Sequence, residues 1–532
     1  MYALTYDVGT TGLKTCLFSI SGKLELAESA YAGYGLYTLE NGGVEQDPEE
    51  WWQAVCSTSR EVIKKAGIRG EDVEALSFCS QMQCLVLVDS EGRPVRRAMS
   101  YLDSRAQRQH AKGISGGFAI GGLNVRKLLV SLAFTKAMAA SVKDPVWKYN
   151  WVRENEPENF SRVCKWLDAK EYLIARMTGN MCMTHDSAYA TMLYDVRPGK
   201  EGWCPPICKM LGVNPDHLPP LIKSSDSAGR LGSRAAEQLG LKEGAPVYGG
   251  GGDAVLIGVG TGATELGDTY VYLGTSGWVS TLIDRQILDI DSRIASIIGP
   301  QPGRFHYFAE IETAAKCLEW VKDHLALDEI GIYLEKKNVT ESLEKVYMNL
   351  YDYLCEVVSR VPAGSGGVIF TPWLHGNRCP FEDPNARGIF FNIGLETGKS
   401  ALIRAVIEGI CYHCRLALEA EEKRVKISDS VMVSGGGALS SVICQILADV
   451  LGRRVLVLPN PQNSGSFGAA IVIAAGLGKI PSIEDAKTLL PPYTAYTPIK
   501  ENKLVHDRNY LVFKSLYRDN KKSFALLNSR PE

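Results

Sequence analysis

The sequence predicts an α/β protein made of two similar halves. The segments "YDVGTTGLK" at 6–14 and "YLGTSGW" at 272–278 both have the pattern of a strand, a Gly-Thr turn and a second strand. Strand and helix patterns that follow each segment are typical of sheets covered by helices. At 532 residues the chain is longer than one core usually supports, so we expect two domains, 1–255 and 256–532.

In the first half, strand patterns at 3–8 and 13–20 enclose the first Gly-Thr turn, and a third follows at 23–32. Asp47 and Pro48 have the residue types of an N-cap and a first helical position, and helical spacing continues to Gly67. Two further strands are predicted at 73–80 and 84–92.

The second half repeats this pattern. Residues 269–284 predict a strand, a turn and a strand, and 430–459 predict a strand, a glycine-rich turn, a helix and a strand. The most apolar run, 469–477, is far shorter than the ~20 residues of a membrane span, so we expect a buried helix there. The N-terminus lacks a basic region and a cleavage site, which favours a cytoplasmic protein.

Composition limits the partners that we expect. The net charge of −2 gives no basic field, so neither nucleic acid nor a membrane is predicted as a partner, while a homodimer stays open. The 14 cysteines show no disulfide-scaffold spacing. Cys411 and Cys414 lie in a helical pattern, where packed thiols are favoured over a metal site.

The two Gly-Thr turns are candidate phosphate-binding loops. Such a turn can direct backbone N–H groups and hydroxyls at one point, and Lys14 adds positive charge to the first. One turn alone would be interpreted as an ordinary hairpin. Two turns on facing halves would hold one polyphosphate from both sides. Residues 394–400 resemble a P-loop but have three residues between the glycines, so we predict only a turn and a helix start.

Two aspartates are candidates for chemistry. Asp7 ends an apolar strand, where a carboxylate is costly unless it is paired, solvated or bound to a cation such as Mg²⁺; the alternative is a turn cap. Asp253 follows four glycines, 249–252, and is placed to accept a proton from an attacking hydroxyl; the alternative is a helix cap. Glycines 435–437 suit a ribose or a flat ring against bare backbone, or simply close packing.

Together these segments resemble the FGGY carbohydrate kinases, within the actin, Hsp70 and sugar kinase fold, over nearly the whole chain. The segments 42–52, 80–106, 186–195 and especially 370–410 are similar to the xylulokinase branch. The resemblance implies two ribonuclease H-like domains flanking a deep cleft. It also implies phosphorylation of a sugar or polyol hydroxyl with ATP and Mg²⁺.

The resemblance assigns roles residue by residue. Asp253 matches the catalytic base and also contacts the sugar, and Asp7 matches the carboxylate near the metal. The nucleotide side comprises Thr10, Thr11, Lys14, Gly274, Thr275, Ser276, Gly436, Gly437 and Ser441. The sugar side comprises Met82, Gln83, Tyr101 and Asp103.

The chain departs from the xylulokinase pattern at Gln83, where a histidine is common, and at Ala254, where an asparagine is common. The segment 113–148 also differs. The loss of these hydrogen-bonding groups affects the choice of sugar more than the kinase chemistry. The resemblance to xylulokinases makes D-xylulose the first substrate expected. Two alternatives stay open: a nucleotide-binding regulatory protein that has lost transfer, and an actin-like assembly protein, which would have no use for the sugar-side segments.

Overall fold

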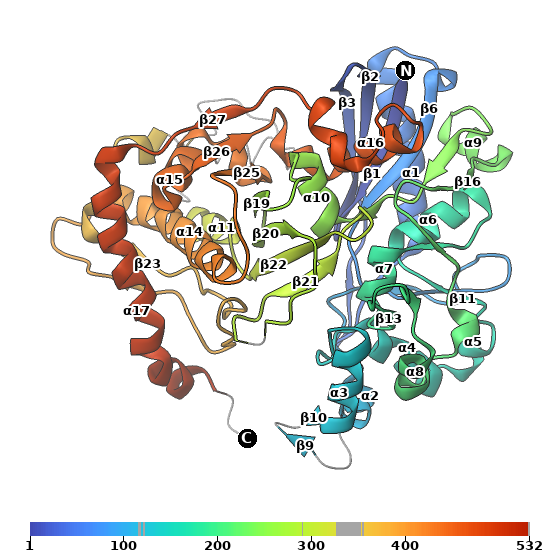
Figure 1. The fold of residues 1–532 in the computed structure, drawn as a ribbon, viewed down its shortest axis with the longest axis horizontal. Coiled ribbons are helices and arrows are strands. Elements are labelled where there is room, and N and C mark those ends of the chain that lie inside the picture. The colour runs from blue at the N-terminus through green and yellow to red at the C-terminus, as the bar shows by residue number, and fades with distance from the viewer. Residues whose placement is uncertain (115–118, 121–122, 290, 326–352, 354–355, 530–532) are drawn as a thin grey trace. The chain divides into compact units, whose positions relative to one another are not determined.

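The computed structural model describes residues 1–114, 119–120, 123–289, 291–325, 353 and 356–529. The chain forms two compact units. Unit 1 comprises Met1–Gly260, Ile297–Arg304 and Gly465–Leu490, and unit 2 comprises Thr261–Ser296, Phe305–Ser464 and Pro491–Glu532. Each unit is built on its own sheet (Figure 1).

The sheet of unit 1 has the strand order β16-β17-β6-β1-β2-β3, and β18 also pairs with β6. The strands are β1 (Tyr2–Val8), β2 (Gly12–Ser21), β3 (Lys23–Gly33), β6 (Val73–Ser80), β16 (Ser227–Arg230), β17 (Pro246–Tyr248) and β18 (Gly251–Gly252). β1, β2 and β3 form an antiparallel meander, whereas β6 runs parallel to β1. The carboxyl ends of β1, β6 and β18 therefore meet at one edge of the sheet.

Helix α1 (Pro48–Ala66) shows how the sequence sets an element of unit 1. Asp47 caps it by accepting the Glu49 N–H at 3.0 Å, and Gly67 ends it in the left-handed conformation. Trp51 and Val55 lie one turn apart and are buried in the core of the unit. This confirms the predicted cap and helix.

The other helices and short strands of unit 1 surround this sheet. The helices are α2 (Gln107–Ile114), α3 (Val125–Phe134), α4 (Pro145–Asn155), α5 (Pro157–Ser161), α6 (Ala169–Thr178), α7 (His185–Ala190), α8 (Pro205–Leu211), α9 (Ser233–Leu239), α10 (Asp253–Thr261) and α16 (Ser464–Gly476). The short strands include β4 (Tyr37–Thr38), β5 (Val44–Gln46), β7 (Val86–Val88), β8 (Ala98–Met99) and β11 (Lys165–Leu167). The strand predicted at 84–92 is thus reduced to β7.

Unit 2 contains the sheet β21-β22-β20-β19-β25-β26-β27. Its strands are β19 (Thr269–Leu273), β20 (Gly277–Ile283), β21 (Ala295–Ile298), β22 (Phe305–Ile311), β25 (Ser430–Ser434), β26 (Arg454–Val457) and β27 (Thr494–Tyr496). Its helices include α11 (Lys316–His324), α14 (Lys399–Glu422), α15 (Ser441–Leu451) and α17 (Lys503–Asn528). Cys411 and Cys414 are buried in α14 among apolar side chains, as predicted.

The two sheets share one topology. In unit 1 the meander β1-β2-β3 continues through the parallel strands β6 and β17; in unit 2 the meander β19-β20-β22 continues through β25 and β26. Numbered along the chain, both give the order 3-2-1-4-5, which is the ribonuclease H-like arrangement. This confirms the predicted fold class and the predicted duplication.

Two smaller predictions are also confirmed. Residues 394–400 form a turn, with Gly398 at the N-cap position of α14. The apolar run from 469 lies in α16, where residues 469–474 are buried. Among the residues that the structure describes, no helix is both long and apolar enough to cross a membrane.

Candidate functional site

The ends of three neighbouring strands bring the two candidate aspartates to one edge of the unit 1 sheet. Asp7 on β1 pairs in register with Cys79 on β6, and Cys79 pairs with Gly251 on β18. Asp253 follows β18 directly and begins α10. The carboxyl edge of parallel strands is where open α/β sheets bind ligands.

Asp7 is partly buried beside a protonated thiol. Burial raises the pKa of its carboxyl above the usual value, while the Lys14 charge and a hydrogen bond from Cys79 lower it. Burial also raises the pKa of the Cys79 thiol, and the charges of Asp7 and Asp253 raise it further. Cys79 therefore stays protonated and serves as a donor to Asp7.

The surroundings of Asp7 fit a magnesium ion held mainly by other ligands. Within the described parts of the chain, no group of three or more His, Cys, Asp or Glu side chains is arranged to hold a metal. Mg²⁺ usually keeps several waters and takes one or two carboxylates together with phosphate oxygens. Asp7 would supply one such carboxylate. Burial disfavours its negative charge, so a cation beside it is stabilising.

The first Gly-Thr turn connects β1 to β2 and is held from several sides. The Gly9 N–H donates to the Gly12 carbonyl at 2.9 Å, and the Tyr34 N–H donates to the Thr11 carbonyl at 3.1 Å. The Thr10 hydroxyl lies 3.1 Å from the Tyr101 hydroxyl. The structure thus brings the predicted phosphate turn next to one predicted sugar residue.

Asp253 is partly buried, and one carboxylate oxygen accepts the Ala254 N–H at 2.7 Å. Asp253 is the first residue of α10, so its carboxylate lies at the N-terminus of this helix. Asp186 on α7 accepts the Gly252 N–H at 2.7 Å and is 1% exposed. This buried carboxylate fixes the backbone of Gly252, the residue before Asp253.

Met82 packs against the glycine that precedes Asp253. A Cβ atom on Gly252 would lie 2.1 Å from the Met82 sulfur, so any larger residue at 252 would displace the Met82 side chain. Gln83 adopts a left-handed backbone, with φ of 65°. Its N–H donates to Asp168 at 2.8 Å, and its carbonyl accepts from Lys148 at 2.8 Å.

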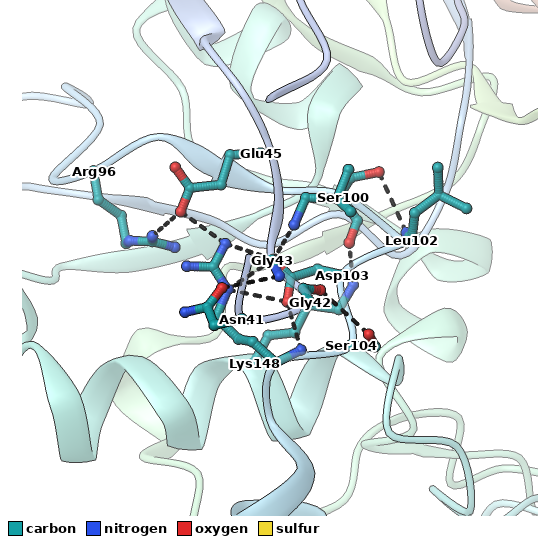
Figure 2. A network of polar contacts seen from close by, with 12 residues as sticks. Asn41, Gly42, Gly43, Glu45, Arg96, Ser100, Leu102, Asp103, Ser104 and Lys148 are labelled. Atoms are coloured by element: carbon teal, nitrogen blue, oxygen red, sulfur yellow. Dashed lines mark hydrogen bonds and ion pairs between the residues drawn. The ribbon is translucent and has the colours of Figure 1, made fainter. Parts of the chain in front are cut away.

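Asp103 lies inside the protein and is 0% exposed. Its carboxylate accepts the Val44 N–H at 2.8 Å and two guanidinium N–H groups of Arg105 at 2.7 and 2.9 Å (Figure 2). Arg105 and Arg96 in turn both pair with Glu45. The contact of Asp103 with the sugar stays a prediction, while in the structure its carboxylate holds the 41–46 segment next to Tyr101.

The second Gly-Thr turn lies at the end of β19 in unit 2. The Gly274 carbonyl accepts the Ala315 N–H at 2.8 Å, and the Thr275 carbonyl accepts the Ala314 and Lys316 N–H groups, each at 3.2 Å. The turn is thus anchored to the start of α11. Thr275 is exposed and Ser276 is partly buried, so both hydroxyls lie near the surface of the unit.

The glycine-rich turn follows β25, the strand next to β19. Gly435 has φ of 91°, and Gly436 and Gly437 begin a short 3-10 helix, Gly436–Leu439. Ser440, not Ser441, caps α15, because its hydroxyl accepts the Ile443 N–H at 3.2 Å. Ser441 is exposed. The predicted nucleotide residues of unit 2 thus lie at the carboxyl ends of two adjacent parallel strands.

Sequence reasoning missed four residues that support the candidate site: Cys79, Lys148, Asp168 and Asp186. Asp168 carried a local signal, since it precedes a helical pattern and caps α6. The other three carried none, because their partners are distant in the sequence. The segment 113–148, which we expected to shape the pocket, lies partly outside the described residues.

Comparison with known proteins agrees with this geometry. Residues 2–260 match the model of the FGGY family of carbohydrate kinases, N-terminal domain, and residues 269–477 match the C-terminal domain of that family. The chain is 28% identical to a xylulose kinase of Bacillus subtilis, with 99% of each chain covered. It is 27% identical to a gluconokinase of Bacillus subtilis, with 94% of this chain and 92% of the relative covered.

Solved structures show the same fold. A xylulose kinase from Lactobacillus acidophilus superposes with a TM-score of 0.82 at 23% identity, over 99% of each chain. A gluconate kinase from the same organism gives the same values. The matches to both domain models, the repeated ribonuclease H-like sheet and the carboxylates at its edge show that the chain belongs to the FGGY family of carbohydrate kinases.

Proposed function

We propose that this protein transfers the γ-phosphoryl group of ATP to a hydroxyl of a small sugar, with D-xylulose as the first candidate. The observation that carries the proposal is the placement of Asp253. It starts α10 at the carboxyl edge of the sheet that also carries Asp7, and Gly252, next to it, packs against Met82. Family membership and the similarity to a xylulose kinase support the same activity.

In the proposed reaction, the Asp253 carboxylate accepts the proton of the sugar hydroxyl. The oxygen of that hydroxyl forms a bond to the γ-phosphorus, while the bond from this phosphorus to the β,γ-bridging oxygen breaks and ADP leaves. In unit 1 we assign the binding of phosphate oxygens to Thr10, Thr11 and Lys14. In unit 2 we assign that task to Gly274, Thr275 and Ser276, and adenosine binding to Gly436, Gly437 and Ser441.

Asp7 is the residue that we propose for Mg²⁺. When bound, the ion supplies positive charge that neutralises the phosphates. The role of Cys79 is to hold the Asp7 carboxylate by donating a hydrogen bond to it.

The choice of sugar depends on Met82, Gln83 and Tyr101. Gln83 and Ala254 stand where xylulokinases commonly have a histidine and an asparagine, so both xylulose and gluconate belong in the test. Polar sites built for particular hydroxyls discriminate strongly among substrates. A cytoplasmic location and a homodimer stay predictions.

The test is a screen for ADP release with ketopentoses, pentitols, tetritols, glycerol, hexoses and gluconate. We expect D-xylulose to give the highest kcat/KM. Asp253→Asn is expected to lower kcat by about 10²- to 10⁴-fold, the usual contribution of a general base, and to leave the KM for ATP nearly unchanged. Near-normal turnover in this variant would remove the role assigned to Asp253.

The alternative of a regulatory protein without transfer predicts a different result. ADP release would then be independent of every added sugar, although ATP would still bind. The presence of Asp7, Asp253 and both Gly-Thr turns favours the kinase.

A further inference from the structure

The backbone of Gln83 is clamped on both sides by buried charged groups. Its φ of 65° is uncommon for a residue other than glycine and requires support from its surroundings. The Asp168 carboxylate accepts the N–H groups of Gln83 at 2.8 Å and Cys84 at 3.1 Å. The Lys148 ammonium donates to the carbonyl oxygen of Gln83 at 2.8 Å. The two groups together hold the turn that directs the Gln83 side chain.

The same ammonium also holds a second segment. Lys148 donates to the Ser100 carbonyl at 2.7 Å, and Ser100 directly precedes Tyr101 (Figure 2). The Ser100 N–H donates to the Val44 carbonyl at 2.9 Å, which connects this segment to the 41–46 segment. One side chain thus joins the two segments that carry Gln83 and Tyr101.

A fully buried lysine ammonium is unusual, so its presence needs an explanation. Lys148 is 0% exposed, and its hydrogen bonds go to two backbone carbonyls. Burial lowers its pKa to about 8, although Cys84, Asp103, Asp168 and Asp144 face it and act in the opposite direction. An apolar side chain of similar length would fill the same space, so packing alone does not require a lysine here.

We propose that Lys148 is a positioning residue that sets sugar affinity by fixing the backbone at Gln83 and Ser100. The inference rests on the proposed function, in which Gln83 and Tyr101 contact the sugar. The KM for ATP is expected to change little, because both hydrogen bonds of Lys148 go to the segments of Gln83 and Tyr101, and its link to the 9–12 turn is indirect, through the Tyr101 hydroxyl 3.1 Å from that of Thr10.

A dependence on pH follows from the same contacts. As the pH rises through about 8, Lys148 loses its charge, and its hydrogen bonds to the two carbonyls weaken. Burial keeps the Cys84 thiol neutral in this range, since its pKa lies well above the usual value. Burial and the Glu171 charge raise the pKa of Asp168 to about 7, so this carboxyl group is mainly ionised above pH 8 and its charge does not account for a change there. The KM for the sugar is therefore expected to rise above pH 8, whereas the KM for ATP is not.

The test compares Lys148→Met with Lys165→Met. Lys165 also donates to two backbone carbonyls, those of Asp216 at 2.7 Å and Leu218 at 3.1 Å, but neither acceptor belongs to the segments of Gln83 and Tyr101. We expect Lys148→Met to raise the KM for the sugar by roughly tenfold or more, since hydrogen bonds to a charged donor are lost. We expect it to leave the KM for ATP unchanged and to abolish the rise of the sugar KM above pH 8. Lys165→Met should match the unaltered enzyme.

Three results would overturn the inference. The first is an unchanged sugar KM in Lys148→Met, and the second is an equal change in the KM values for sugar and ATP. If Lys148→Met does not fold, the unaltered enzyme decides: a sugar KM that stays constant from pH 7 to 9.5 is the third. Absence of sugar-dependent ADP release by the unaltered enzyme would instead refute the proposed function, and this inference with it.

Discussion

Asp186 acts on Asp253 through the main chain. Its carboxylate accepts the Gly252 N–H, and Asp253 is the next residue. The other oxygen of Asp186 is buried and has no hydrogen-bond partner among the described residues. A buried carboxylate that makes one hydrogen bond to a backbone amide is costly to keep. We infer that the position of Asp253 depends on this contact.

Asp186→Ala is expected to lower kcat by roughly ten- to a hundredfold, because an unsatisfied buried N–H costs about 1–3 kcal/mol and the turn before Asp253 loosens. Asp186→Asn retains an acceptor and should recover most of the loss. The KM for ATP should stay the same in both variants.

Asp226→Ala is the matched control. Asp226 also accepts a backbone N–H, that of Lys223 at 3.0 Å, but it is exposed. Steady-state kinetics of the three variants measure whether the Gly252 contact positions Asp253. Equal kcat values for Asp186→Ala and Asp226→Ala would show that the Gly252 contact does not position Asp253.

Single residues could be predicted from the sequence where their chemistry is local. Asp7 and Asp253 stand out because each is a carboxylate at a strand end or beside a glycine run. Lys148 and Asp186 could not be found in this way, because their partners lie 65 and 66 residues away. Asp168 has the local signal of a helix cap, but its bond to Gln83, 85 residues away, has none. The sequence also does not reveal that Asp103 pairs with the guanidinium of Arg105, two residues later.

At the scale of elements, α10 and α16 approach each other so closely that only glycine fits between them. A Cβ atom on Gly468 would lie 2.1 Å from the carbonyl oxygen of Leu256, a backbone atom in the first turns of α10. Asp253 is the first residue of α10. The packing of α16 therefore helps to define where the proposed base lies.

Gly468→Ala is expected to destabilise the protein by about 1–3 kcal/mol, the usual cost of overpacking, and to lower kcat because α10 must shift. Gly394→Ala is the control, since a Cβ atom at that position meets no neighbouring atom within 4 Å and the residue lies outside any helix. Urea unfolding and ADP release measure the two effects. A stability equal to that of Gly394→Ala would contradict the close contact between α10 and α16.

Most elements follow from local patterns. The N-cap and Pro48 predict α1, and the alternation around each Gly-Thr turn predicts β1, β2, β19 and β20. The strand predicted at 84–92 was too long, because the observed strand covers Val86–Val88, which pairs with β11. Pairing partners of this kind are not visible in a single sequence.

At the scale of the whole molecule, duplication explains why one turn recurs. Each copy of the 3-2-1-4-5 sheet places its Gly-Thr turn between the first two strands. The sequence predicts this, because the turn and its flanking strands are local. It does not predict that residues 465–490 pack in unit 1, since nothing local marks the unit to which a helix belongs.

The 465–490 segment is expected to be required for unit 1 to fold. Phe467 packs on Phe18 with ring centroids 4.7 Å apart, and the Leu24 N–H donates to the Leu489 carbonyl at 2.8 Å. Without the segment, a fragment 1–260 exposes this apolar surface and loses these bonds to β2 and β3. We expect the fragment to show no cooperative thermal unfolding by circular dichroism.

Joining 465–490 to the fragment through a flexible Gly-Ser linker should restore a cooperative transition and resistance to protease, because the segment then packs intramolecularly. Residues 503–528 of α17, which belong to unit 2, joined through the same linker, should not. If the fragment 1–260 alone unfolds as cooperatively, and at the same temperature, as the joined chain, the segment is dispensable and unit 1 is complete at residue 260.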